Sequence, residues 1–222
     1  MKLIPTSPNR EEYLACTPLV DYDHPQVAAL AKQLGEGETD PFVLGRKCYH
    51  FVRDEIGHSW DVKGHAVPAT ASQTLLAGEG ICFAKSMLLA ALLRYHGIPT
   101  GFCYQRLRLG AVPGKYCIHA LNGVFLTPPG DWIRQDARGR RPNREAEFSN
   151  VKEILPCHPD PAKEEVDYPF LLPHPHPAVV DCLRRNTDAI WMYLNDLPEE
   201  LSFPFPARRQ NPVISSGKRC AF

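Results

Sequence analysis

Cys82 occupies a position in which a cysteine could act as a nucleophile. It follows the turn Gly78-Glu-Gly80 and opens residues 82–95, the longest helical apolar pattern in the chain. A thiol attacks as its thiolate, and the unpaired N–H groups and the dipole of a helix N-terminus favour that negative charge. The same N–H groups could hold a developing oxyanion, with Gly78 and Gly80 leaving room for a substrate carbonyl. The pattern predicts an acyl-transfer nucleophile, and a buried structural thiol is the alternative.

Such a thiol needs a base and a group that orients the base, and His119 and Asp136 are the candidates. Alternating apolar residues predict strands over residues 116–126 and 131–138, joined by the turn signal Thr127-Pro-Pro-Gly. A hairpin symmetric about this turn would place His119 directly opposite Asp136, within hydrogen-bond reach. Asn122-Gly123 is a competing turn signal, and a turn there would separate the pair.

The elements that position these residues follow from the apolar spacing. Apolar residues that recur about every 3.6 positions, together with capping residues, predict three helices, over residues 24–34, 41–56 and 71–77. They end at or near Gly35, Ile56 and Gly78. Residues 82–95 are too apolar for a one-sided surface helix and predict a buried central helix. Beyond Pro99 the period changes to two, so strands follow helices as a block. This order predicts an α+β fold with the helix that begins at Cys82 packed on an antiparallel sheet.

The remaining segments give weaker patterns. Residues 57–70 look like a loop, and the proline-dense residues 156–177 predict an extended surface segment. Residues 179–194 predict one amphipathic helix, and residues 198–222 an irregular, basic tail. We therefore expect a core over residues 1–155, with residues 156–222 wrapped around it rather than forming an independent domain.

Composition narrows the class of protein. The 222 residues can bury a substantial core, and 25 basic residues balance 25 acidic ones, which argues against nucleic acid or an anionic membrane as partner. No apolar stretch has the length of a secretory signal or a membrane span, so a cytoplasmic location is expected. The eight cysteines are scattered without a CxxC motif, as in a protein whose thiols are reduced and mostly buried. A peptide or small-molecule amide is the expected partner.

Other polar clusters are less persuasive. His58, Asp61 and His65 have a spacing that a metal could use, but they lie in a loop-like stretch, and a solvated loop is the preferred interpretation. The histidines in the Pro-His-Pro-His-Pro run of residues 173–177 receive the same interpretation. The basic residues 138–144 could orient an anionic substrate, although a solvated loop is favoured again. We expect neither a metal nor a cofactor.

Four segments together resemble the transglutaminase-like superfamily, a papain-like α+β fold. They are YHFVRDEIGHSWD at residues 49–61, ASQTLLAGEGICFAKSMLLAALLRYHGIPT at 71–100, IHA at 118–120 and DWIRQDARG at 131–139. The resemblance implies a thioester formed at Cys82, with His119 as general base and acid and Asp136 orienting its imidazole. Members of the family include transglutaminases, peptidases and peptide N-glycanases.

The sequence departs from the family in two places. Family members often carry an aromatic residue soon after the histidine, where Leu121 and Asn122 stand here. The tryptophan that donates to the oxyanion in animal transglutaminases has no clear counterpart, and Trp60 or Gln73, with Gly80, are the substitutes considered. No acidic cluster has the spacing of an EF-hand, so calcium activation is not expected.

These observations favour a cysteine-dependent enzyme that hydrolyses an amide or peptide bond. Hydrolysis is preferred by analogy, because the chain lacks the extra domains and calcium sites of crosslinking enzymes. Two alternatives stay open: an acyltransferase or transglutaminase that passes the acyl group to an amine, and a non-catalytic binding protein that retains the fold.

Overall fold

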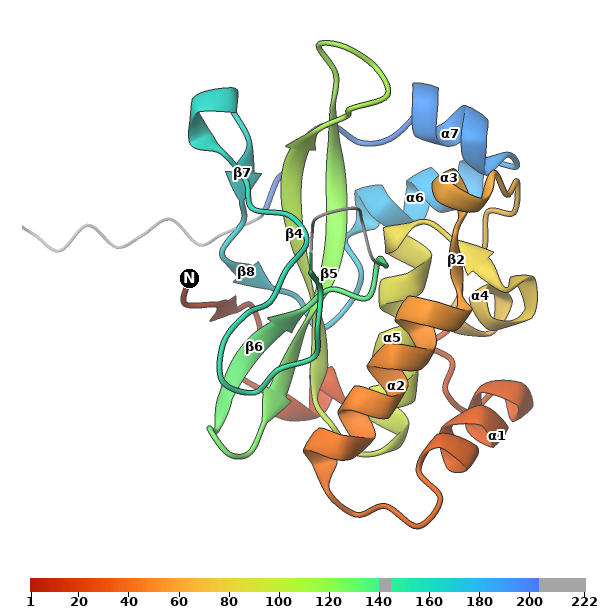
Figure 1. The fold of residues 1–222 in the computed structure, drawn as a ribbon, viewed down its shortest axis with the longest axis vertical. Coiled ribbons are helices and arrows are strands. Elements are labelled where there is room, and N and C mark those ends of the chain that lie inside the picture. Colours follow the sequence, from red (N-terminus) through yellow and green to blue (C-terminus); the bar gives the residue numbers. More distant parts are fainter. Residues whose placement is uncertain (140–144, 204–222) are drawn as a thin grey trace, which may run out of the picture.

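The computed structural model describes residues 1–139 and 145–203, in which helices pack against one side of an antiparallel sheet (Figure 1). The helices are α1 (Pro25–Leu34), α2 (Pro41–Glu55), α3 (Ser59–Val62), α4 (Ala71–Ala77), α5 (Cys82–Tyr95), α6 (Pro177–Arg185) and α7 (Ala189–Asn195), with 3-10 turns η1 (Arg10–Tyr13) and η2 (Pro161–Lys163). The strands are β1 (Ile4–Pro5), β2 (Gly57–His58), β3 (Glu79–Gly80), β4 (Thr100–Arg108), β5 (Tyr116–Leu126), β6 (Asp131–Gln135), β7 (Val166–Asp167) and β8 (Phe170–Leu171). The predicted α+β class is confirmed. Residues 140–144 of the basic stretch and residues 204–222 of the predicted tail lie outside the described residues.

Helices α2 and α4 begin at polar caps. Asp40 accepts a hydrogen bond from the backbone N–H of Phe42 at 2.8 Å and so opens α2. Thr70 accepts from the backbone N–H of Gln73 at 3.1 Å and opens α4. Gly78 ends α4 in the left-handed conformation, with φ of 66°. The sequence predictions for these helices are confirmed because caps and stops act over a few residues.

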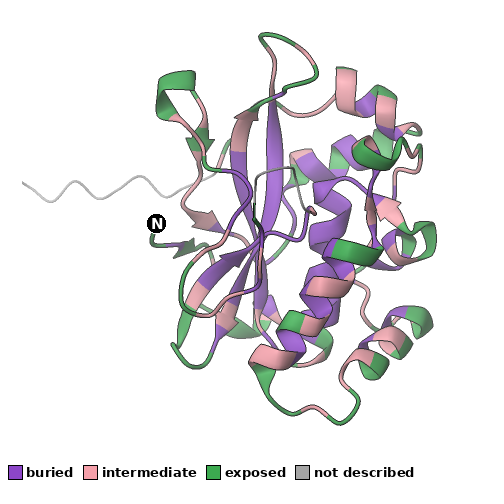
Figure 2. Cartoon of the chain, viewed as in Figure 1, coloured by how far each residue is buried: buried purple, intermediate pink, exposed green. Residues whose placement is uncertain are grey.

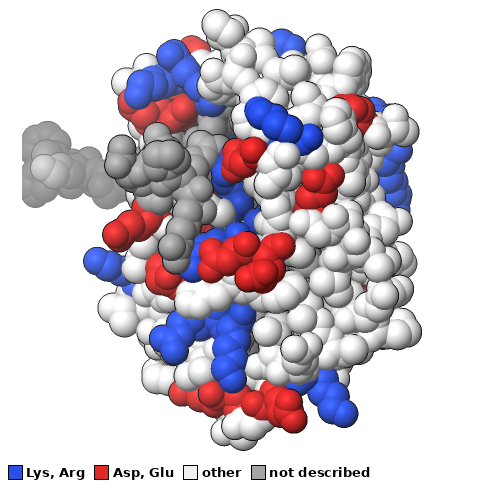
Figure 3. All heavy atoms as spheres, turned by 45° about the vertical axis from the view of Figure 1, so that its right-hand side comes forward, with Lys and Arg blue, Asp and Glu red and all other residues white. Residues whose placement is uncertain are grey.

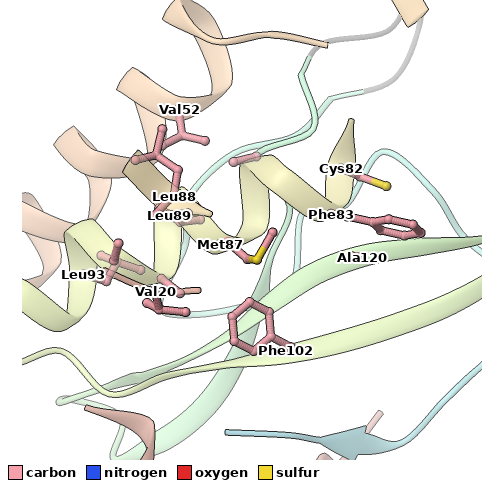
Figure 4. Packing of buried hydrophobic residues seen from close by; sticks show 14 of the residues in the cluster. Val20, Val52, Cys82, Phe83, Met87, Leu88, Leu89, Leu93, Phe102 and Ala120 are labelled. Carbon is pink, nitrogen blue, oxygen red and sulfur yellow. The ribbon is translucent and has the colours of Figure 1, made fainter. Parts of the chain in front are cut away.

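Helix α5 is the centre of the core, as predicted. Every residue from its first to Arg94 is buried, and in Figure 2 the helix lies inside a shell of more exposed elements. Val52 of α2 packs on one side of it, and Phe102 of β4 and Ala120 of β5 face it from the sheet (Figure 4). The core therefore fixes the position of the helix whose first residue is Cys82.

The four-stranded sheet has the order β6-β5-β4-β7, and all its neighbouring strands are antiparallel. The hairpin of β5 and β6 runs from the pair Leu126–Asp131 to the pair Asn122–Gln135. Asn122 and Gly123 thus lie inside β5, and the competing turn is not used.

The predicted register of this hairpin is wrong by two residues. Pairing ends at Gln135, and the same register continued would place Arg138, not Asp136, opposite His119. The turn is centred one residue later than predicted, and this moves the residue opposite His119 by two positions along the second strand. Because side chains alternate with a period of two, a two-residue shift keeps the partner on the same face.

The proline-dense residues 156–177 do not simply run over the surface as predicted. Strand β7 pairs with β4, strand β8 pairs with β1, and Pro173 and Pro175 are buried. Extended proline-rich backbone can pair at the edge of a sheet where its missing N–H groups face away from the ladder.

The predicted single helix over residues 179–194 is two helices, α6 and α7, because Asp188 caps a new helix by accepting from the N–H of Trp191 at 2.8 Å. The predicted loop over 57–70 contains β2 and α3.

Among residues 1–139 and 145–203, no helix combines the length and the apolar character needed to cross a membrane. Acidic and basic side chains are interspersed on the face shown in Figure 3, as the balanced charge of the chain suggests.

Candidate active site

His119 and Asp136 form a buried hydrogen-bonded pair. Nε2 of His119 lies 2.6 Å from Oδ2 of Asp136, and the two residues are 6% and 1% exposed. The other carboxylate oxygen accepts the backbone N–H of Arg138 at 2.9 Å, while the Tyr49 hydroxyl donates to the backbone carbonyl of Asp136 at 2.8 Å. Asp136 is therefore held in place although it lies one residue beyond β6.

Cys82 is the first residue of α5 and is 8% exposed. The N-cap residue, Ile81, makes no side-chain hydrogen bond to the helix, so the first-turn N–H groups have no side-chain cap. Nε2 of His119 is hydrogen-bonded to Asp136, so Nδ1 is the ring nitrogen that can form a hydrogen bond with the Cys82 thiol. Cys82 comes from α5, His119 from β5, and Asp136 from the residue that directly follows β6. Packing of the helix on the sheet holds these elements together.

The electrostatics of the three groups are coupled. Burial alone would raise the pKa of the Cys82 thiol, but the charge of His119, a hydrogen bond to His119 and the N–H of Ala120 lower it below its ordinary value. Burial opposes the charged form of His119, yet the charges of Asp136 and Cys82 raise its pKa well above the ordinary value. Burial likewise opposes ionised Asp136, and His119 nevertheless lowers the pKa of this carboxyl. The arrangement favours a thiolate beside an imidazolium.

Cys82 and His119 open onto a cavity of about 70 Å³. Its wall is formed by His58, Ile81, Cys82, Leu107, Arg108, Gly110, Cys117, Ile118, His119, Arg138, Cys157, Tyr193 and Leu197. Cys157 and Tyr193 belong to the C-terminal segment, which therefore closes one side of the cavity. Cys117 is buried, as expected for most of the cysteines, and it also lines the cavity.

The three residues considered for the oxyanion lie elsewhere. Trp60 stacks on Tyr193 with ring centroids 4.5 Å apart, and the exposed Gln73 accepts the backbone N–H of Ala69 at 2.9 Å. Gly80 is buried, and a Cβ on it would meet that of Ala84 at 2.7 Å, so packing against α5 requires a glycine there. Within the described part of the chain, none of the three belongs to the cavity wall.

His58 is a cavity residue that the sequence pattern did not reveal. It is 5% exposed, and its strand β2 pairs in parallel with β3 so that His58 lies beside Gly80, two residues before Cys82. Strands of two residues leave no periodic signal. The only available sign was the position of His58 within the segment that resembles the family.

The histidines and acids considered as metal ligands separate in the structure. Asp61 pairs with Arg138, His65 pairs with Asp188 at 2.6 Å, and His58 lines the cavity. Nε2 of the buried His176 donates a hydrogen bond to the backbone carbonyl of Ser202, 3.0 Å away. No group of three potential ligands with metal-binding geometry occurs among residues 1–139 and 145–203.

Comparison with known proteins supports this fold assignment. The family model of the transglutaminase-like superfamily matches residues 28–137, a range that contains all three residues of the site. Residues 28–137 belong to the transglutaminase-like superfamily. This places them among cysteine-dependent enzymes.

A solved structure also matches, described as that of a candidate cysteine protease from Cytophaga hutchinsonii, with 18% identity and a TM-score of 0.46. The match covers 60% of this chain and 43% of that protein, so the chain spans less than half of its length. Comparison with curated proteins found no match.

Proposed function

We propose that the protein is a cysteine-dependent acyl-transfer enzyme that hydrolyses an amide or peptide bond through a thioester at Cys82. The observation that carries the proposal is the buried His119–Asp136 pair beside the first residue of α5. Its neighbours lower the pKa of the Cys82 thiol despite burial. A structural thiol would have no need of such a pair.

In the proposed reaction, the Cys82 thiolate attacks the substrate carbonyl carbon and a C–S bond forms. The imidazolium of His119 gives its proton to the leaving amine as the C–N bond breaks. His119 then takes a proton from water, the resulting hydroxide attacks the thioester, and the C–S bond breaks to release the carboxylic acid. Asp136 holds the imidazole and stabilises its charge throughout.

The oxyanion of each tetrahedral intermediate would be held by backbone N–H groups in the first turn of α5. His58 is the buried side chain that we assign as the second donor, because it lines the cavity together with Cys82. Trp60, which stacks on the cavity residue Tyr193, would shape the wall rather than donate.

The C-terminal segment would belong to the same catalytic unit. Cys157, Tyr193 and Leu197 complete the cavity wall that residues 58–138 begin. We propose on this ground that residues 156–203 wrap the core and do not act as an independent domain.

The test is trapping of the acyl-enzyme. The protein is incubated with a panel of amides, esters and peptides, and its intact mass is measured after acid quenching. An adduct of the acyl mass on the wild-type protein, absent from Cys82→Ala, supports the proposal. Adducts that form equally on both proteins would contradict it.

The same reactions, repeated with an excess of a primary amine, distinguish hydrolysis from transfer. Release of the free acid despite the amine indicates a hydrolase, whereas an amide product indicates an acyltransferase. Both outcomes require the Cys82 thioester. The absence of any adduct, combined with a thiol pKa near the ordinary value of about 8.5, would favour a non-catalytic binding protein.

A further inference from the structure

The charged residues on the wall of the cavity are all basic. Arg108 and Arg138 line it, and no acidic side chain among the described residues does. Asp136 lies behind His119, and Asp61 is bound to Arg138. A ligand in the cavity therefore meets guanidinium groups and the imidazole rather than carboxylates.

Arg138 is a fixed and buried part of this wall. Its side chain is 3% exposed, and its Nη1 and Nη2 donate to the two carboxylate oxygens of Asp61 at 2.5 and 3.0 Å. Its backbone N–H donates to Asp136, which anchors the residue to the catalytic pair. A guanidinium has five N–H donors, and the two given to Asp61 leave others for a second anion. The charge of the Cys82 thiolate is among those that raise the pKa of Arg138, so the two groups act on each other.

Arg108 is the last residue of β4, is exposed to solvent, and lines the cavity. The carboxylate of Glu165 accepts the backbone N–H of Arg108 at 3.0 Å. The guanidinium itself has no ion-pair partner within the part of the chain that the structure describes. Lys163 lowers the pKa of Asp160, and the charge of Arg108 contributes a smaller part of this effect, so the guanidinium lies near acidic side chains while it lines the cavity.

The volume of the cavity limits the size of the group it can hold. About 70 Å³ is small beside the roughly 300–1,000 Å³ typical of pockets for drug-sized ligands. A long peptide side chain would not fit, whereas a chain of a few carbon atoms would.

We propose that the acyl group of the substrate is short and ends in a carboxylate, which Arg138 binds inside the cavity and Arg108 attracts at its mouth. This rests on the proposed function, because the carboxylate would be bound while the carbonyl at the other end of the acyl group reacts with Cys82. Succinyl and malonyl amides are representatives of this class. The forked guanidinium matches a carboxylate in two hydrogen bonds, which gives a preference over neutral acyl groups.

The first test compares the succinyl and butyryl amides of one fluorogenic arylamine, which differ in the terminal carboxylate. We expect kcat/KM for the succinyl amide to be at least about tenfold higher, the ratio that loss of a charge-assisted hydrogen bond produces. Arg108→Gln and Arg138→Lys should each reduce this preference. Arg46→Gln, which removes the same charge from an exposed site on α2, should leave it unchanged.

The second test measures the preference of the cavity for a negatively charged reagent and does not need a substrate. Iodoacetate and iodoacetamide have similar size and differ in charge, and mass spectrometry gives the rate at which each alkylates Cys82. The exposed Cys16 supplies the reference ratio in the same chain. The imidazolium of His119 also attracts iodoacetate. The decisive quantity is therefore how far the ratio of the iodoacetate rate to the iodoacetamide rate falls when wild type is replaced by either arginine variant.

The outcomes separate the two proposals. Equal turnover of both amides, or an unchanged alkylation ratio in Arg108→Gln and Arg138→Lys, overturns the anionic acyl group and leaves the proposed function standing. If neither amide is hydrolysed, the ratio of the iodoacetate to the iodoacetamide rate at Cys82 decides whether the arginines give the cavity a preference for an anion. If Cys82 reacts with both reagents no faster than Cys16, the reactive thiol is refuted and this inference fails with it.

Discussion

Two buried cysteines on different sides of the sheet show what makes a thiol reactive. Cys82 lies at the start of α5, beside His119, and the pKa of its thiol is lowered. Cys103 lies in a second, smaller core with Leu3, Tyr13, Leu121, Leu155 and Leu171. Burial raises the pKa of the Cys103 thiol, and the opposing charge of Arg134 is offset by Glu153 and Asp167.

Both thiols are buried, so burial does not explain the difference. Desolvation is the largest influence on each and disfavours both thiolates. Only Cys82 has a cationic partner in direct hydrogen-bond contact, and that partner is itself held by a carboxylate. The comparison indicates that the ionised neighbours, supplied by the hairpin of β5 and β6, convert a core cysteine into a candidate nucleophile.

Replacement of each thiol is the strongest way to break this comparison. Cys82→Ala should lower turnover by roughly 10³-fold or more, since the nucleophile is lost. Cys103→Ala should retain turnover and lose about 1 kcal/mol of stability, because a small buried group is removed. Labelling with a limiting amount of iodoacetamide at neutral pH, together with denaturant unfolding, measures both effects. Equal labelling of the two thiols in the wild-type protein would be inconsistent with an activated Cys82.

Asp136→Asn tests whether the carboxylate behind His119 matters. The substitution removes the charge that stabilises the imidazolium and should lower kcat by about 10²–10⁴-fold. Asp188→Asn is the matched control, because Asp188 and His65 form a pair of the same 2.6 Å length with side chains 43% and 71% exposed. We expect the control to change kcat by less than about twofold, as exposed pairs contribute little. Similar losses in both variants would show that the buried pair has no special role.

The pH dependence of alkylation should distinguish the two thiols. Because the pKa of Cys82 is lowered, its thiolate should persist below the ordinary value of about 8.5 and its reactivity should fall only as pH drops through the lowered value. Because the pKa of His119 is raised, the imidazolium should persist above about 6.5, and kcat should fall as pH rises through the raised value. Cys103 should stay unlabelled throughout. Thiolate absorbance that is the same in wild type and Cys82→Ala near neutral pH would count against this picture.

The smallest effect on the site is expected from a substitution in the second core, which should change stability and leave the reactivity of Cys82 unchanged. A Cβ on Gly123 would lie 2.5 Å from Cδ1 of Leu171 and 3.3 Å from Sγ of Cys103. Gly123→Ala should therefore cost about 1–3 kcal/mol of stability by overpacking, without changing the alkylation rate of Cys82. Gly110→Ala is the stability control, since its Cβ would meet nothing within 4 Å. A loss of Cys82 reactivity in Gly123→Ala would mean that the two sides of the sheet are coupled.

Much of the fold could be predicted because its signals are local. The caps at Asp40 and Thr70, the apolar run of α5 and the alternation of β4 and β5 are local signals, the longest of which extends over 14 residues. The hairpin turn after Leu126 was identified from four residues of the sequence. The exact register was not, since the turn residues alone do not fix which residue ends the ladder.

The cavity was harder to predict because distant segments form it. His58 reaches it through a parallel pair of two-residue strands, and Arg138 is fixed by Asp61, which lies 77 positions earlier in the sequence. Cys157 comes from a segment expected to run over the surface, and Tyr193 comes from the helix predicted to follow it. None of these contacts leaves a periodic pattern in the chain.

The sequence by itself determined which residues could react: a cysteine at the head of an apolar helix, and a histidine and an aspartate predicted on consecutive strands. Those properties depend on local periodicity and turn chemistry, which neighbouring residues encode. Only the tertiary structure decided that Asp136 meets His119 from beyond the end of β6, that the pKa of Cys82 falls despite burial, and that two arginines line the cavity. Those features depend on packing between remote segments, because hydrogen bonds and charges act over a few ångströms whatever the distance along the chain.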